Sequence, residues 1–129
     1  MNFIAKEIST EIDEDNNITV AFSSSNDEYF MIQFSGEFDE QDVKLGTDTY
    51  HIEKNNQSMG TFGGIENIQL YSDRITFNLN QKGQLKLEEK NIQITINCSD
   101  QQFENLSLQL SNIFNSKEEH LLSIHELKN

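Results

Sequence analysis

The sequence predicts an α+β fold, mainly an antiparallel β-sheet covered by one C-terminal amphipathic helix. Four segments alternate large apolar and polar residues with a period of two, and one later segment repeats apolar residues with helical spacing. Alternation with a period of two indicates a strand with one buried and one solvated face, which is typical of antiparallel sheets. The chain has 129 residues, so we expect one domain spanning 1–129.

The strands are expected in the following places. The four alternating segments are 18–23, 30–35, 74–79 and 92–98, and shorter strands are predicted at 48–53 and 65–71. Residues 3–12 fit either a strand or a helix, and a strand that pairs with 18–25 is favoured. Residues 81–90 are compatible with a short helical turn or with one arm of a hairpin.

The C-terminal helix has a clear start. Ser99 can cap it, and Gln102 three residues later completes a capping box. Its apolar stripe, which should pack on the apolar face of the sheet, consists of Phe103, Leu106, Leu110, Ile113 and Phe114. Apolar residues return near the end of the chain, where a last edge strand is predicted, at Leu121, Leu122, Ile124 and Leu127.

A net charge of −13 is the strongest signal in the composition, and it is uneven. Residues 1–48 hold 12 acidic and 2 basic residues, whereas residues 49–129 hold 10 acidic and 7 basic ones. Nucleic acids and anionic membranes bind positive surfaces, so neither is expected as a partner. A basic protein partner is compatible with this charge, and so is the plainer interpretation that acidity only keeps the protein in solution.

The cysteine content and the N-terminus indicate a cytoplasmic protein. Cys98 is the sole cysteine, so no internal disulfide can form, which suits a reducing cytosol. The first residues contain no apolar run long enough for a signal peptide. No segment approaches the roughly 20 apolar residues that a membrane-spanning helix needs.

No motif for catalysis, a metal or a cofactor emerges from the residues, so we expect none of the three. The histidines His51, His120 and His125 lack the spacing of metal ligands and are interpreted as surface residues. Cys98 is in phase with the apolar positions of 92–98 and is interpreted as a small core residue. The glycines of 60–64 lack the lysine and the following helix of a phosphate loop, so they indicate a bulge, a positive-φ turn or a close backbone approach. The carboxylates of 39–48 match neither a calcium loop nor a glycosidase.

The segment 38–50 is the most distinctive part of the chain. Together with the strand at 29–33 before it and Phe62-Gly63-Gly64-Ile65 after it, this segment resembles immunity protein family ten of the bacterial polymorphic toxin systems. The resemblance covers about residues 28–70, and Phe62 stands where the family pattern has a tyrosine. It implies a protein made beside a toxin gene that binds the toxin domain and has no catalytic residues.

Charge and resemblance together predict a partner-binding surface and a structural motif. The proposed partner-binding residues are Glu37, Asp39, Glu40, Asp42 and Asp48 in the distinctive segment, with Asp13, Glu14, Asp15, Asp27 and Glu28 at predicted turns. The proposed structural motif is Leu45, Gly46, Tyr50, Phe62, Gly63 and Gly64. Within it Leu45 and Gly46 make a turn, and Asp39 caps a short helix before them. The segment can act as scaffold or as direct contact, and both interpretations stay open.

The leading hypothesis is an immunity protein that binds one cognate toxin domain and occludes its active site. Many toxin domains attack nucleic acid and are basic, and an acidic inhibitor can mimic the phosphates that such a nuclease seeks. The alternative is an acidic, non-enzymatic ligand- or protein-binding module without a toxin partner. The residues do not indicate an oligomeric state.

Overall fold

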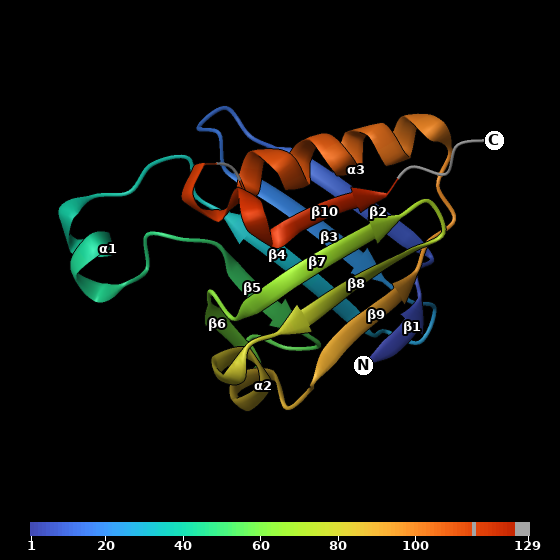
Figure 1. The fold of residues 1–129 in the computed structure, drawn as a ribbon, viewed down its shortest axis with the longest axis horizontal. Coiled ribbons are helices and arrows are strands. Elements are labelled where there is room, and N and C mark those ends of the chain that lie inside the picture. Colours follow the sequence, from blue (N-terminus) through green and yellow to red (C-terminus); the bar gives the residue numbers. More distant parts are fainter. Residues whose placement is uncertain (115, 126–129) are drawn as a thin grey trace.

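The computed structural model describes residues 1–114 and 116–125 and contains two β-sheets that face each other (Figure 1). The first sheet has the spatial order β1-β9-β8-β7-β10, and the second has the order β2-β3-β4-β5-β6. The strands are β1 (Asn2–Ile4), β2 (Glu7–Ile12), β3 (Ile18–Ser23), β4 (Tyr29–Phe34), β5 (His51–Lys54), β6 (Gly60–Phe62), β7 (Ile65–Tyr71), β8 (Arg74–Leu79), β9 (Asn91–Thr95) and β10 (Leu122–His125). The helices are α1 (Glu40–Leu45), α2 (Gln81–Leu87) and α3 (Asp100–Ile113), followed by a 3₁₀ segment, η1 (Ser116–Leu121). None of the helices in these described ranges is long and apolar enough to cross a bilayer.

The apolar faces of the two sheets cover each other. Phe77 of the first sheet contacts Phe22 and Phe30 of the second, with ring centroids 6.1 Å and 4.7 Å apart. All three rings are fully buried, and burying one such side chain contributes roughly 1.5–3 kcal/mol. The alternation read from the sequence therefore places the apolar residues of both sheets in one shared core.

Most neighbouring strands are antiparallel, as predicted, but β1 pairs parallel with β9 and β10 pairs parallel with β7. The single strand expected over 3–12 is two strands: Glu7–Ile12 pairs with β3 as predicted, whereas Phe3 and Ile4 belong to β1, which pairs with β9 instead. The chain changes sheets in between, because the Ala5 N–H donates to Thr95 and the Lys6 N–H donates to Ser23. The predicted edge strand near the end is β10, whereas Leu127 lies outside the described residues.

The α+β class is confirmed, but the expectation of one sheet covered by one helix is wrong. Because each sheet covers most of the other, α3 lies at one side of the sandwich, beside the edge strand β10, and contacts β3 and β2 of the second sheet (Figure 1). Its predicted capping box between Ser99 and Gln102 is present. Four residues of its predicted stripe are buried, and Phe103 is only partly buried.

The strand predicted over 92–98 ends earlier than expected. Pairing in β9 stops at Thr95, so Cys98 lies beyond the strand and is half-buried against the edge of the core. Burial raises the pKa of its thiol. The expectation of a core residue within a strand was therefore wrong in its local structure, although Cys98 still contacts the core.

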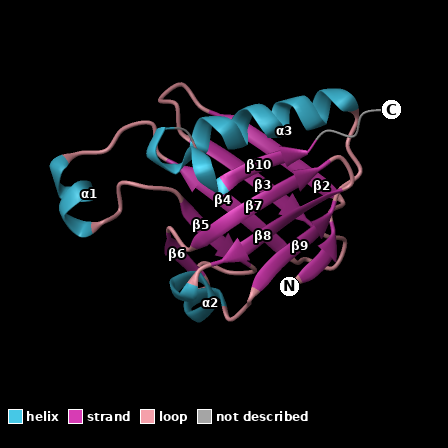
Figure 2. Ribbon diagram, in the orientation of Figure 1, coloured by secondary structure: helices cyan, strands magenta, loops and turns pink. Residues whose placement is uncertain are grey.

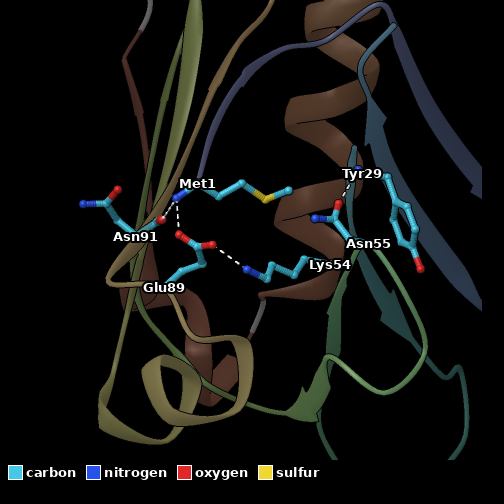
Figure 3. Close-up of polar contacts among 6 residues, drawn as sticks. All are labelled: Met1, Tyr29, Lys54, Asn55, Glu89 and Asn91. Atoms are coloured by element: carbon cyan, nitrogen blue, oxygen red, sulfur yellow. Dashed lines mark hydrogen bonds and ion pairs between the residues drawn. The ribbon is translucent and has the colours of Figure 1, made fainter. Parts of the chain in front are cut away.

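A cluster of charges joins the two sheets at the end of β5. Figure 3 shows that the N-terminal ammonium of Met1 and the amine of Lys54 pair with the two carboxylate oxygens of Glu89. The ammonium also donates to the carbonyl of Asn91 at 3.0 Å. Burial alone would raise the pKa of Glu89, but the hydrogen bonds and positive charges of Lys54 and Met1 hold that pKa below its ordinary value.

Replacing Glu89 with Gln should lower the free energy of unfolding by about 1–3 kcal/mol near neutral pH, because two largely buried cations lose their anion. A depressed carboxyl pKa stabilises the fold above the unfolded pKa of about 4.3, and this stabilisation is lost as pH falls through the folded value. The deficit of E89Q should therefore shrink below about pH 4. Urea unfolding of E89Q and the wild-type chain at several pH values measures this difference in free energy. The control is Glu66→Gln, because Glu66 is exposed. A deficit that is independent of pH would contradict this account.

Candidate functional site

The connection between β4 and β5, residues 35–50, carries α1 away from the two sheets (Figure 2). We term these residues the arm. No residue of α1 is buried, and the side chains of Val43 and Leu45 are 59% and 67% exposed. Single exposed apolar residues are ordinary on protein surfaces. Two of them on a projecting helix, surrounded by carboxylates, mark a surface that the core does not require.

Hydrogen bonds at its two ends hold α1 together. The Asp39 carboxylate accepts the Asp42 N–H at 2.8 Å, and the Asp42 carboxylate accepts the Asp39 N–H at 3.0 Å. These two bonds form a capping box. Gly46 ends the helix with φ 72°, a left-handed conformation that glycine adopts without steric cost. The structure thus contains the cap at Asp39 and the turn at Gly46 that the sequence suggested.

The turn between β2 and β3, residues 13–17, lies beside the base of the arm. The Gly36 N–H donates to the side-chain oxygen of Asn17 at 3.1 Å, and a Cβ added to Gly36 would come within 2.3 Å of the Asp15 carbonyl. We term this turn and the arm together the acidic end. It contains one amine, that of Lys44, and eight of the ten acidic residues proposed from the sequence: Asp13, Glu14, Asp15, Glu37, Asp39, Glu40, Asp42 and Asp48.

The other two proposed residues, Asp27 and Glu28, lie in the turn between β3 and β4. Successive antiparallel hairpins reverse direction, so this turn is at the opposite end of the second sheet. The Ser24 hydroxyl accepts the Glu28 N–H at 3.1 Å and helps to shape the turn locally. Asp27 and Glu28 therefore cannot share one compact contact surface with the acidic end.

A hollow of about 670 Å³ opens on the outer face of the second sheet at the acidic end. Its floor is a row of side chains that are neighbours across four strands: Thr19, Gln33, His51 and Phe62. The rings of Phe34 and Phe38 meet edge to face in its wall, with centroids 5.5 Å apart. Asp13 and Asp42 also line the hollow. Among the residues that the structure describes, no Lys or Arg lines it.

The hollow is negative near neutral pH. Hydrogen bonds from the backbone and side-chain amides of Asn17 lower the pKa of Asp13. Burial lowers the pKa of His51, against the opposing effect of Glu53, so its imidazole is neutral at pH 7. Within residues 1–114 and 116–125, no group of three or more His, Cys, Asp or Glu side chains could hold a metal ion.

Tyr50 and the glycine pair connect the end of the arm to the core. The Tyr50 hydroxyl accepts the Ile65 N–H at 2.9 Å, and its ring contacts Phe114, with centroids 4.8 Å apart. Burial raises the pKa of Tyr50 to about 12. Gly63 and Gly64 both have positive φ, as the sequence suggested, and Gly64 lies against α2. In contrast, Leu45 and Phe62, two other members of the proposed structural motif, are exposed.

Sequence reasoning missed the apolar part of this surface. The sequence assigned Val43 no role of its own, and the spacing of the histidines indicated only a surface residue at His51. Phe38 had no role beyond its place in the distinctive segment. One signal for it was present in the sequence: Thr19 and Gln33 both lie on the polar side of their alternating strands. The hollow itself can be located only when the register of the four strands is known, because register decides which side chains are neighbours.

The fold and this surface define a β-sandwich with a projecting acidic arm. The sequence model of one protein family, Immunity protein 10, matches residues 4–104. No curated protein and no solved structure matches the chain. The family match spans the arm, the hollow and the glycine pair, and the chain belongs to the Immunity protein 10 family. It is therefore an immunity protein with a toxin as its counterpart, and the resemblance read from the distinctive segment is confirmed.

Replacing Gly83 of α2 with Ala should destabilise the fold, although Ala is the better helix former by about 1 kcal/mol. The new Cβ would lie 2.2 Å from the carbonyl oxygen of Gly64, so α2 or the glycine pair must shift. We expect a loss of about 1–3 kcal/mol in the free energy of unfolding, measured with urea. Lys82→Ala, at an exposed position of the same helix, should be neutral or slightly stabilising. A gain in stability for G83A would contradict the close approach of the two glycines.

Proposed function

We propose that this chain neutralises one toxin domain by binding it through the acidic end and covering the toxin's active site. The observation that carries the proposal is α1, a projecting helix inside the region matched by the family that presents Val43 and Leu45 to solvent. Protein interfaces commonly combine apolar anchors with a polar rim. The proposed role is binding without catalysis or a cofactor, and its proposed location is the cytoplasm of the cell that makes the toxin.

The proposed partner is a basic domain, such as a nuclease. The acidic end carries eight carboxylates and one amine, so its field attracts a positive surface. Surfaces that bind nucleic acids are positive because they neutralise phosphates. Carboxylates held where phosphates would lie can cover such a surface. This complementarity also raises the association rate constant toward roughly 10⁸–10⁹ M⁻¹s⁻¹ at low salt.

Scaffold and contact roles are divided within the distinctive segment, in our proposal. Asp39, Asp42 and Gly46 shape α1 through their hydrogen bonds and backbone conformation. Val43 and Leu45 face solvent and are available to the toxin. The two interpretations that the sequence left open thus apply to different residues of one short helix.

Co-expression with the toxin domain encoded beside the gene tests this function. Cells that produce the toxin domain should survive with the wild-type chain and survive poorly with Leu45→Ser, whose Kd for the toxin should rise roughly tenfold. The matched control is Leu85→Ser, because Leu85 is 73% exposed on α2, outside the acidic end. Equal cell death with and without the wild-type chain would overturn the immunity function. Equal toxin binding by L45S and L85S would overturn the arm as the contact.

Association of the chain with its toxin should slow as salt is raised, because counterions screen the acidic end. Replacing Glu37 and Glu40 with Gln should lower the rate constant at low salt and flatten its dependence on salt. The matched control neutralises Asp27 and Glu28 at the opposite end of the sheet. Stopped-flow measurements at several ionic strengths compare the three proteins. Rates that do not respond to salt in the wild-type chain would remove charge steering from the proposal.

A further inference from the structure

We infer that the hollow at the acidic end receives an arginine side chain of the toxin domain. This inference rests on the proposed function and specifies the chemistry of one contact within it. The hollow is a concave, half-open space of about 670 Å³ on the outer sheet face, beside the arm that we propose as the apolar anchor. A side chain projecting from a protein bound to the arm can therefore enter it.

The walls of the hollow suit a guanidinium group. Phe34 and Phe38 meet edge to face in one part, and Phe62 packs edge to face on His51 in another, with centroids 4.9 Å apart. A guanidinium is planar, weakly hydrated and stacks on aromatic rings. Because burial keeps His51 neutral near pH 7, it adds a further uncharged ring and no competing positive charge.

The carboxylates of the hollow are held in place before any partner binds. Asp13 accepts hydrogen bonds from the Asp15 N–H and from both amides of Asn17, at 2.9 to 3.0 Å. Asp42 accepts from the Asp39 N–H at 3.0 Å and from the Thr47 hydroxyl at 3.3 Å.

A carboxylate has about four acceptor positions, so each of these two retains capacity for a cation. Their fixed orientation removes part of the entropy cost of forming an ion pair.

Arginine fits this arrangement better than the other cations that a toxin or the cell can offer. A lysine ammonium is a compact, strongly hydrated charge and gains less from flat aromatic walls. Metal ions require several converging oxygen ligands, whereas the hollow offers two carboxylates on separate elements, the turn after β2 and α1. The combination of aromatic rings with fixed carboxylates is typical of sites that bind guanidinium groups.

Filling the hollow with an arginine of the chain's own tests the inference. Gln33 lies exposed on its floor, on the central strand β4, and Gln33→Arg places a guanidinium inside it. The matched control is Gln93→Arg, an exposed position on the outer face of β9 in the other sheet. We expect Q33R to raise the Kd for the toxin domain at least tenfold and Q93R to leave it within about twofold of wild type. Equal Kd values for the two variants, with equal thermal stability, would overturn the inference.

A titration without the toxin examines the hollow directly. N-acetyl-argininamide should produce saturable NMR shifts of the backbone amides of Thr19, Gln33 and His51 at millimolar concentrations, and these shifts should be absent in Q33R. N-acetyl-citrullinamide, which has nearly the same shape and no charge, should produce none. Equal shifts with both compounds, or none with either, would overturn the guanidinium site.

The two experiments separate this inference from the function on which it rests. If the wild-type chain binds its toxin and Q33R binds equally well, the arginine contact is wrong and the immunity function stands. If the wild-type chain does not bind the toxin, the proposed function is wrong, and the argininamide titration still decides whether the hollow takes a guanidinium.

Discussion

The mutual burial of two sheet faces is the constraint from which the rest of this structure follows. Phe77 sits against Phe22 and Phe30, so the apolar side of each sheet is the cover of the other. Because both inner faces are occupied, α3 packs at one side of the sandwich. The chain crosses from one sheet to the other between β1 and β2. The outer faces of the sheets and the helix α1 are then available for binding, and α1 has no buried residue.

The distribution of charge follows the same division. At the end of β5 away from the arm, Lys54 and Glu89 are paired within the protein, where an unpaired charge would be costly. At the other end, Asp39 and Asp42 lie at the start of α1, where the helix dipole and the capping hydrogen bonds favour negative charge. A chain with a net charge of −13 thus keeps most of its described acidic residues on a surface that water solvates, with Glu53 and Glu89 as exceptions. Their mutual repulsion is concentrated at the acidic end, where α1 buries no residue.

Local features of the sequence predicted local features of the structure well. The alternation in 18–23 and 74–79 gave strands with the expected buried phase, and Ser99 and Asp39 cap helices as their positions suggested. Both signals depend on interactions within a few residues. Cys98 shows the limit of this reasoning, because the alternation in the sequence continues past Thr95, where strand pairing ends.

Features that depend on distant residues could not be read in the same way. Alternation shows that one face of a strand is buried but not what covers it, so a second sheet was mistaken for a helix. The parallel pairing of β1 with β9 joins segments that are far apart in the sequence. The hollow needs Thr19, Gln33, His51 and Phe62 in one row, which requires three correct strand registers at once. The acidic residues were identified in sequence, but their separation into two opposite ends follows only from the hairpin topology.

The way α1 is held has a consequence for how such proteins diverge. Its six residues bury nothing, and its ends are fixed by Asp39, Asp42 and Gly46, so side chains between these positions can be exchanged at little cost in fold stability. When a toxin surface mutates, an inhibitor of this design can follow it through changes in one short helix while the sandwich remains intact. Recognition can therefore evolve faster than architecture within this lineage.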